Sequence, residues 1–358
     1  MNTIYIGLLF LFLSASASFA QPFAYITNAG SDNVSVINNQ NNNVIATIPV
    51  GDRPQGITVS HDNQSIYVIN SGDDTISKIS TATNTVTETF DSMDINNPSR
   101  LVETPDGQFL YVSGSQQNIV QVVSIATKQV VDTINVPGNP IQIAISPDGN
   151  FVYTSNAFGD SVTVIRTSDN TVVNTIPLGA RPSGISVSPD NKFVYIGLRF
   201  EDLLGVIDIQ TQSLIRTIPV SGSGPNFLVT SPDGNFVYVS LSGTSNVSII
   251  STQTNSEIAL IPVGNPPSLP FGIDVTADGN FIYVANINND TVSVISVPQL
   301  REIRTIPVGE SPFSGGLFIT NEIPIVNVPT LSQWGLIAFV GILGISGLIA
   351  IRKRAFNS

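Results

Sequence analysis

Cysteine is absent from this chain of 358 residues, and histidine occurs once, as His61. Without thiols, the protein can form neither disulfides nor thiolate metal sites. His61 lies in a polar His-Asp-Asn turn, which predicts an exposed turn residue, and no Ser-His-Asp set, histidine metal site or haem motif can be assembled. We therefore expect no catalytic residue, cofactor or metal. The acidic turn residues, which lack the dense oxygen spacing of a calcium loop, are Asp106, Asp148, Asp233 and Asp278.

Charged side chains are also scarce, at 11% of the residues. Residues 1–20 hold none, and residues 329–358 hold only three, all basic. The stretch between them carries 11 basic and 26 acidic groups, and hence a net charge of −15. A body this acidic repels nucleic acid and anionic lipid, so we expect no nucleic-acid partner.

What the chain does contain is a repeat. Seven of its eight tyrosines recur at intervals of 42, 44, 42, 42, 43 and 45 residues. A period this constant indicates a repeat architecture. The seven positions are Tyr25, Tyr67, Tyr111, Tyr153, Tyr195, Tyr238 and Tyr283.

Each period contains four short strand-like runs, as at 152–156, 161–167, 171–178 and 182–190. The connections are rich in Asn, Asp, Gly and Ser, which suits tight hairpins, and no helical segment separates the runs. Runs such as 193–196 are apolar throughout, as expected of strands buried on both faces. The pattern predicts an all-β protein, a seven-bladed β-propeller with four-stranded antiparallel blades.

The strand order within a blade follows from composition. The run at 182–190 contains small residues that fit a crowded central channel, so we expect it innermost. The runs that end in Ile-Pro are expected outermost, because proline removes a ladder donor and belongs on an exposed edge. These prolines are Pro49, Pro177, Pro219, Pro262 and Pro307.

The ends of the repeat predict how the ring closes. The chain enters the repeat at a second strand, 23–28, and its last repeat stops after an innermost strand at about 313–320. We expect one composite blade that combines three N-terminal strands with this C-terminal one. The propeller then spans 21–320.

Short motifs show which family the repeat resembles. YITN at 25–28, YVAN at 283–286, TIPVG at 47–51 and 305–309, and the SPDG turns resemble the YVTN-type β-propeller repeat of surface-layer and related exported proteins. The resemblance covers about 22–320. It implies the propeller fold but no particular activity, because propellers host enzymes, adhesins and scaffolds alike.

Residues 1–20 read as a secretory signal peptide. An apolar run over 4–13 ends in small residues, and we expect cleavage between Ala20 and Gln21. No Lys or Arg precedes the run, so an uncleaved membrane anchor is the alternative.

The C-terminus predicts a membrane segment. After a linker at 321–333, residues 334–351 are apolar or small and carry no charge. A helix of that length spans roughly 27 Å, close to the thickness of a bilayer core. The basic tail at 352–358 is expected in the cytoplasm, which places the propeller outside the inner membrane.

The motif VPTLSQWG at 328–335 resembles the IPTL-type C-terminal sorting signal of Gram-negative bacteria. The resemblance implies an exosortase-type transpeptidase that cuts near the motif, after which the protein passes to the cell surface or outer membrane. A permanent inner-membrane anchor is the alternative. The motif residues are Pro329, Thr330, Leu331, Ser332, Trp334 and Gly335.

The loops that enter the innermost strands are expected to face one mouth of the channel. Arg53 and Arg181 lie in such loops, and in an acidic body they are candidates for contacting an acidic ligand or partner. The alternative is that each pairs with a neighbouring acid such as Asp52 or Glu310.

The segment 199–202 breaks the polar pattern of its loop with Arg199 and Phe200. We consider these two residues as candidate partner contacts, and irregular packing as the alternative.

Together these features favour an exported, surface-anchored propeller that serves as a non-catalytic binding, adhesion or surface-layer module for a surface protein or glycan. One alternative is a lactonase-like hydrolase, which would need His, Arg and Glu together at the channel mouth. Another is a structural matrix protein without a discrete ligand.

Overall fold

The computed structural model describes residues 18–20, 22–91, 94–321 and 323–325. Gln21–Asn321 form one compact unit. In a second unit, β1 (Ser18–Ala20) pairs antiparallel with β29 (Ile323–Ile325). The apolar run of the predicted signal peptide, the sorting motif and the predicted helix at 334–351 lie outside the described residues. No helix within the described part is long and apolar enough to cross a membrane.

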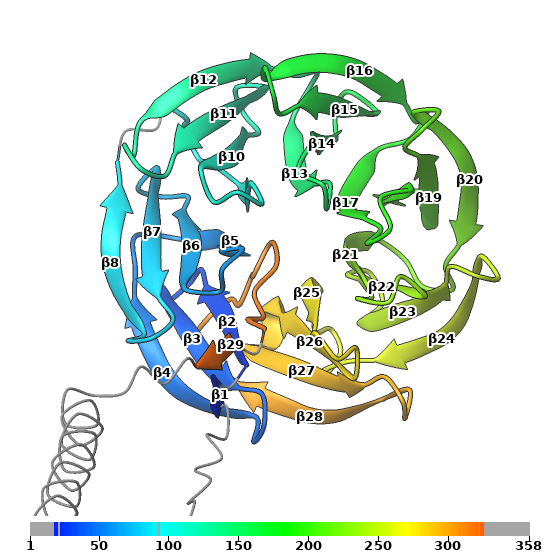
Figure 1. Ribbon diagram of the computed structural model, residues 1–358. Coiled ribbons are helices and arrows are strands. Elements are labelled where there is room, and N and C mark those ends of the chain that lie inside the picture. Colours follow the sequence, from blue (N-terminus) through cyan, green and yellow to red (C-terminus); the bar gives the residue numbers. More distant parts are fainter. Residues whose placement is uncertain (1–17, 21, 92–93, 322, 326–358) are drawn as a thin grey trace, which may run out of the picture. The chain divides into compact units, whose positions relative to one another are not determined.

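Residues 22–321 form a ring of seven antiparallel sheets (Figure 1). The innermost strands surround a cavity at its centre, called here the channel. Six sheets have four strands, each taken from one continuous segment, and the seventh contains β2, β3 and β4. The predicted seven-bladed β-propeller is confirmed.

The innermost strand of each continuous blade lines the channel, and the next strand carries the repeated tyrosine (Figure 1). The innermost strands are β5 (Pro54–Val59), β9 (Arg100–Glu103), β13 (Pro140–Ile145), β17 (Pro182–Val187), β21 (Pro225–Thr230) and β25 (Pro270–Val275). The second strands are β2 (Phe23–Asn28), β6 (Ser65–Asn70), β10 (Phe109–Gly114), β14 (Phe151–Asn156), β18 (Phe193–Leu198), β22 (Phe236–Leu241) and β26 (Phe281–Asn286).

The third strand joins the outermost one through a hairpin turn. The third strands are β3 (Asn33–Asn38), β7 (Thr75–Ser80), β11 (Ile119–Ser124), β15 (Ser161–Arg166), β19 (Leu203–Asp208), β23 (Asn246–Ser251) and β27 (Thr291–Ser296), the last preceded by the short 3-10 helix η1 (Ile287–Asn289). The outermost strands, which include the Ile-Pro runs as expected, are β4 (Asn43–Pro49), β8 (Thr85–Phe90), β12 (Val130–Asn135), β16 (Thr171–Pro177), β20 (Ser213–Pro219), β24 (Ser256–Pro262) and β28 (Arg301–Pro307).

Burial explains the sequence pattern of these strands. In β2, β6 and β14 only the first residue is partly exposed, because neighbouring blades cover both faces of the strand. In β16 most side chains are exposed and the isoleucine before the terminal proline is buried, as suits a strand with a single neighbour. The consecutive apolar residues therefore belong to the middle of each blade.

The ring closes through residues 310–320, called here the closing segment. Phe313 N donates to Thr27 O (2.8 Å), and Tyr25 N donates to Phe318 O (2.9 Å), so both ends of the segment run antiparallel to β2. The predicted composite blade is therefore present. The expectation of a regular strand over 313–320 is wrong, because the middle of the segment leaves β2.

That middle part pairs with the next blade instead. Gly315 N donates to Gln55 O (2.9 Å), and Val59 N donates to Leu317 O (3.1 Å). The excursion depends on Gly316, whose φ of 148° favours glycine and whose Cβ, if present, would collide with the Ile57 carbonyl oxygen. The closing segment thus pairs with both β2 and β5.

One buried carboxyl group fixes the far end of the closing segment. Asp274 Oδ2 accepts hydrogen bonds from Phe318 N (2.7 Å) and Ile319 N (2.8 Å), and Oδ1 accepts one from Val275 N (2.8 Å). Burial raises the pKa of Asp274 to about 7, although the three N–H donors act in the opposite direction. Asp274 therefore links the composite blade to β25.

Candidate functional site

The channel has two mouths. At the entry mouth, loops lead into the innermost strands, and at the turn mouth, SPDG-type turns lead out of them. Each of several entry loops is held by a side chain of the preceding blade: Arg53 N donates to Asp32 Oδ1 (3.0 Å), and Ser311 N donates to Asp290 Oδ1 (2.8 Å). The acidic groups at this mouth thus fix the conformation of the entry loops. The acceptors of this kind are Asp32, Asp74, Asn118, Asp202 and Asp290.

Arg53 lies at the entry mouth with an exposed side chain and a left-handed backbone (φ 52°). Within the described part of the chain its guanidinium makes no hydrogen bond or ion pair. Asp52, one of the acids considered as its partner, instead donates its backbone N–H to Asp73 (2.6 Å). The Arg53 side chain is left to solvent.

Arg181 forms the centre of a three-residue stack that we call the mouth ladder. Its guanidinium carbon lies 4.3 Å from the ring centre of Phe158 and 5.4 Å from that of Phe200. Nε donates to Ala157 O (3.1 Å), which fixes the plane of the guanidinium. Phe158 is 67% exposed and Phe200 is 65% exposed. Two large apolar side chains and one cation are thus held together at the surface.

The sequence pointed to two members of the ladder, Arg181 and Phe200, and missed Phe158. A signal for it exists, because Phe158 and Phe200 occupy the same position in the loops between second and third strands of adjacent blades. Three other blades have glycine there, at Gly30, Gly72 and Gly243. Arg199, the fourth candidate, is exposed beside Phe200.

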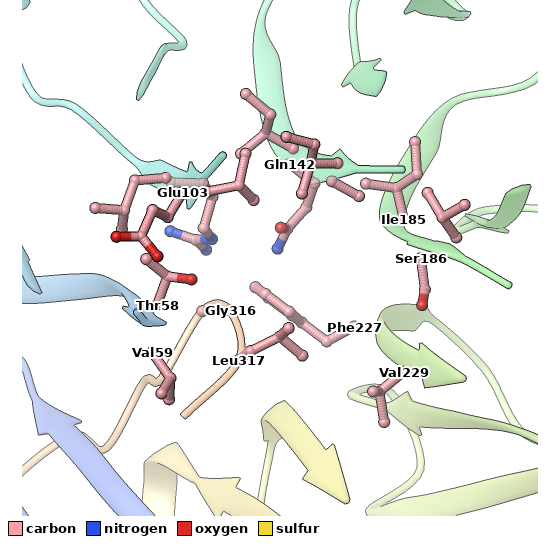
Figure 2. A pocket seen from close by; sticks show the side chains of 18 of the residues that line it. Thr58, Val59, Glu103, Gln142, Ile185, Ser186, Phe227, Val229, Gly316 and Leu317 are labelled. Carbon is pink, nitrogen blue, oxygen red and sulfur yellow. The ribbon is translucent and has the colours of Figure 1, made fainter. Parts of the chain in front are cut away.

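The channel itself is a cavity of about 400 Å³ (Figure 2). Its wall is mostly apolar and comes from the innermost strands of five blades, from Ile273 of a sixth and from the closing segment. It reaches the turn mouth at His61 and Pro147. None of the four predicted contact residues lines it. Its apolar lining includes Val59, Leu101, Ile143, Ile185, Val229 and Leu317.

Three polar or bulky side chains enter this cavity at one level. The third residue counted from the entry proline of each inner strand is glycine in three blades, Gly56, Gly184 and Gly272, where the neighbouring backbone approaches closely. In the other three continuous blades the equivalent residues, all lining the cavity, are Arg100, Gln142 and Phe227. None of the three was predicted from the sequence, although their departure from glycine is visible in the repeat.

At the turn mouth, Glu103 and His61 line the same cavity. His61 lies in an exposed turn, as predicted, and its backbone N–H donates to Glu103 Oε2. Burial raises the pKa of Glu103 to about 7, and Asp62 and Asp106 act in the same direction, whereas the His61 N–H and Lys78 oppose it. The channel therefore holds a carboxyl group that titrates near neutral pH.

The acidic turn residues have structural partners. Ser231 Oγ donates to Asp233 Oδ1 (2.6 Å), and Asn235 N donates to the same oxygen (3.0 Å). The Ser231 hydrogen bond is the main reason why the pKa of Asp233 is lowered. The same Ser/Thr-x-Asp contact recurs at Asp106, Asp148 and Asp278. Among the described residues no group of three or more His, Asp or Glu side chains is placed to hold a metal ion.

With this geometry established, comparison with known proteins identifies the class. A sequence profile of the YNCE-like beta-propeller family matches residues 11–324, and the chain belongs to this family. The IPTL-CTERM motif matches residues 328–354, which indicates a C-terminal sorting signal. No curated protein matches the chain.

Solved structures share the fold at low sequence identity. Hydrazine synthase of Kuenenia stuttgartiensis is 23% identical, with a TM-score of 0.67 over 74% of this chain and 89% of that one. A functionally unknown protein from Desulfotomaculum acetoxidans is 16% identical, with a TM-score of 0.69 over 82% and 99%. The dihydro-heme d1 dehydrogenase NirN in complex with DHE is 15% identical, with a TM-score of 0.61 over 85% and 75%. At these identities the likeness shows the propeller fold alone.

Proposed function

We propose that this protein is an exported propeller of a Gram-negative cell surface that binds a surface protein or glycan through the mouth ladder and catalyses no reaction. The observation that carries the binding role is the pair of exposed phenylalanines, Phe158 and Phe200, on either side of Arg181. Aromatic residues and arginine dominate the energetics of protein interfaces.

The side chains of the mouth ladder are held in position before a partner binds. A cation over an aromatic ring at an exposed site is worth about 0.5–1 kcal/mol, and the Ala157 carbonyl fixes the guanidinium further. The side chains thus lose little additional freedom when a partner arrives, which lowers the cost of binding. The remaining N–H groups of the Arg181 guanidinium can donate to an acidic group of a protein or a glycan.

The proposed location rests on the two ends of the chain. Residues 1–20 would direct export, with cleavage between Ala20 and Gln21. The segment 334–351 would hold the tail in the inner membrane until an exosortase-type transpeptidase cuts near the motif at 328–335. The mature propeller would then reach the cell surface or outer membrane. One intact mass of the cell-surface form locates both cleavage sites.

A binding experiment tests the proposed role. The labelled full chain, in lipid nanodiscs, is titrated onto cells of the source bacterium from which the gene has been deleted. We expect saturable binding that falls at least about tenfold in the double variant Phe158→Ala/Phe200→Ala. Ile215→Ala, which removes an exposed apolar side chain from outer strand β20, is the matched control and should bind normally.

Two outcomes would contradict the proposal. Equal binding by the ladder variant and the control would remove the ladder from the contact. Self-association of the purified chain without saturable binding to cells would favour a structural matrix protein.

One observation favours the hydrolase as a second candidate. The cavity is lined by His61, Arg100 and Glu103, the three residue types that a lactonase-like propeller would need near a channel mouth. A lactone-hydrolysis assay on the full chain decides: turnover that disappears in Glu103→Gln, but not in Phe158→Ala/Phe200→Ala, would replace the non-catalytic proposal.

A further inference from the structure

Arg100 is a buried cation without an anionic partner. It is 6% exposed, and no carboxylate oxygen of the described residues lies within 4 Å of its guanidinium. Nη1 donates to Ser99 O (2.5 Å), whereas Nε has no hydrogen-bond partner. Burying a charge without compensation is costly, and burial accordingly lowers the pKa of Arg100 to about 9. The side chain remains charged at neutral pH.

Aromatic rings hold this guanidinium in place. Its carbon lies 5.0 Å from the ring centre of Phe227 and 4.9 Å from that of Phe313. Phe271 extends the cluster, 4.6 Å from Phe227 and 4.2 Å from Phe313 between ring centres. Gly315 packs against Nε and Cζ of the guanidinium. Nη2 has no hydrogen-bond partner among the described residues, and it is the donor left for an acceptor.

Gln142 supplies a second unpaired donor in the same cavity. The side chain is 6% exposed, and its Nε2 has no hydrogen-bond partner. Figure 2 shows its amide directed into the space bounded by Thr58, Ser186 and Phe227. Buried donors of this kind are normally satisfied, and a group of negative charge in the cavity would be an acceptor for Arg100 and Gln142.

The remainder of the cavity determines what such an anion can carry. Beyond the two donors the wall is mostly apolar, with Leu101, Val229 and Leu317 among its residues. A volume of about 400 Å³ is near the lower end of the range for small-molecule pockets, about 300–1,000 Å³. The net charge of −15 over residues 21–328 disfavours polyanions.

We propose that the channel binds a small monocarboxylate with an apolar body, its carboxylate on Arg100 and Gln142 and its body against the apolar wall. A carboxylate accepts hydrogen bonds from both donors and neutralises the guanidinium. A neutral apolar molecule would leave both unpaired. This site goes beyond the proposed surface function and does not depend on it, because the mouth ladder lies outside the cavity.

Calorimetric titration of the full chain in lipid nanodiscs tests the site, with sodium 4-phenylbutanoate as the probe and the uncharged 4-phenylbutanamide as its neutral counterpart. We expect the acid to bind at least about tenfold more tightly than the amide. Arg100→Met should abolish that preference, and Gln142→Leu should weaken acid binding about threefold or more. Arg301→Met removes an exposed arginine from outer strand β28 and should change neither titration.

Three results would overturn the proposal: no binding of the acid at millimolar concentration, equal affinity for acid and amide, or an unchanged preference in Arg100→Met. Circular dichroism checks that each variant is folded. If Arg100→Met does not fold, Gln142→Leu decides, because the site requires that variant to lose affinity for the acid and keep its affinity for the amide. Phe158→Ala/Phe200→Ala should leave the acid titration unchanged, which separates this site from the surface function.

Discussion

The continuous blades and the composite blade hold their innermost segment in place through different contacts. In a continuous blade such as β17–β20, hairpin turns keep all four strands together, and the innermost strand pairs with the second along its length, with one register shift between Pro182 and Ile185. In the composite blade no turn joins the closing segment to β2, and the two meet only at isolated bridges. Side-chain contacts must therefore hold the closing segment against β2, because no turn connects the two.

The residues of the closing segment show this difference. Phe318 and Ile319 pack in a cluster with side chains from β2 and β3 and with Tyr283 and Val292 of the preceding blade. The Asp274 carboxylate then binds the backbone of the same two residues. Closure of the ring therefore depends on a few buried groups. In each continuous blade, by contrast, the innermost strand is held by pairing along the strand.

Deleting residues 313–320 should be the largest perturbation. It removes the buried Phe318, whose replacement by alanine alone would cost about 3–5 kcal/mol, and it exposes the inner edge of β2. We expect a loss of at least about 5 kcal/mol, which is comparable to the stability of many domains. Thermal unfolding followed by circular dichroism measures it. Deleting 323–325, strand β29 of the second unit, should leave the melting temperature nearly unchanged, and an equal effect of both deletions would contradict the closure.

Asp274→Ala should come next. It leaves the N–H groups of Phe318 and Ile319 buried without an acceptor, at about 1–3 kcal/mol each. Ser186 occupies the same place in β17, and Ala144 in β13 already lacks a polar group there. Ser186→Ala is the comparison variant: Ser186 Oγ accepts a hydrogen bond from one backbone group, Thr230 N (3.2 Å), so we expect this variant to cost about half as much as Asp274→Ala. Denaturant unfolding at pH 6 compares the two, and similar losses would mean that Asp274 has no special role in closure.

The pH dependence of the free energy of unfolding should also show the effect of Asp274 in the closing region. The pKa of Asp274 is raised to about 7 in the folded protein from 3.8, so the folded state holds a proton that the unfolded state releases. Its contribution is complete below about pH 4 and falls as the pH rises through 7. Asp274→Asn should flatten the profile between about pH 4 and 7. Glu103, shifted in the same direction, remains in both proteins, so the difference between their profiles isolates Asp274. Parallel profiles would refute the assignment.

The sequence predicted the features that repeat. Seven tyrosines at a constant interval gave the number of blades, and the Ile-Pro runs gave the outer edge. The closing segment could not be predicted as it is, because the path through Gly315 and Gly316 depends on backbone contacts with β5 that no local pattern encodes. The ends of the chain were predicted from motifs, and the IPTL-CTERM match supports the C-terminal one.

The residues of the candidate sites, by contrast, occur where a blade departs from the repeat. Arg100, Gln142 and Phe227 stand where other blades have glycine, and Phe158 stands where three have glycine. A position-by-position comparison of the blades would have found them. It would not have shown that Arg100 lacks an anionic partner or that Arg181 stacks between two rings, because those facts depend on how neighbouring blades meet.

The smallest predicted effect compares one position in two adjacent continuous blades. Tyr111 Oη donates to Asn170 Oδ1 (2.5 Å) in the outer turn of the next blade. Tyr153 has no partner for its buried hydroxyl, and Gln212 stands where Asn170 would recur. Tyr111→Phe should cost about 1 kcal/mol, the net worth of one hydrogen bond.

In Tyr153→Phe the same change removes an unsatisfied polar group, so stability should be unchanged or slightly higher. Denaturant midpoints of the two variants measured side by side test this, and the lost contact should also appear as faster hydrogen exchange in the 167–171 turn of Tyr111→Phe. Equal costs for both variants would show that the tyrosine hydroxyls do not link neighbouring blades. The ring would then depend on apolar packing between its faces, with the closing segment as the place where hydrogen bonds to a buried side chain matter most.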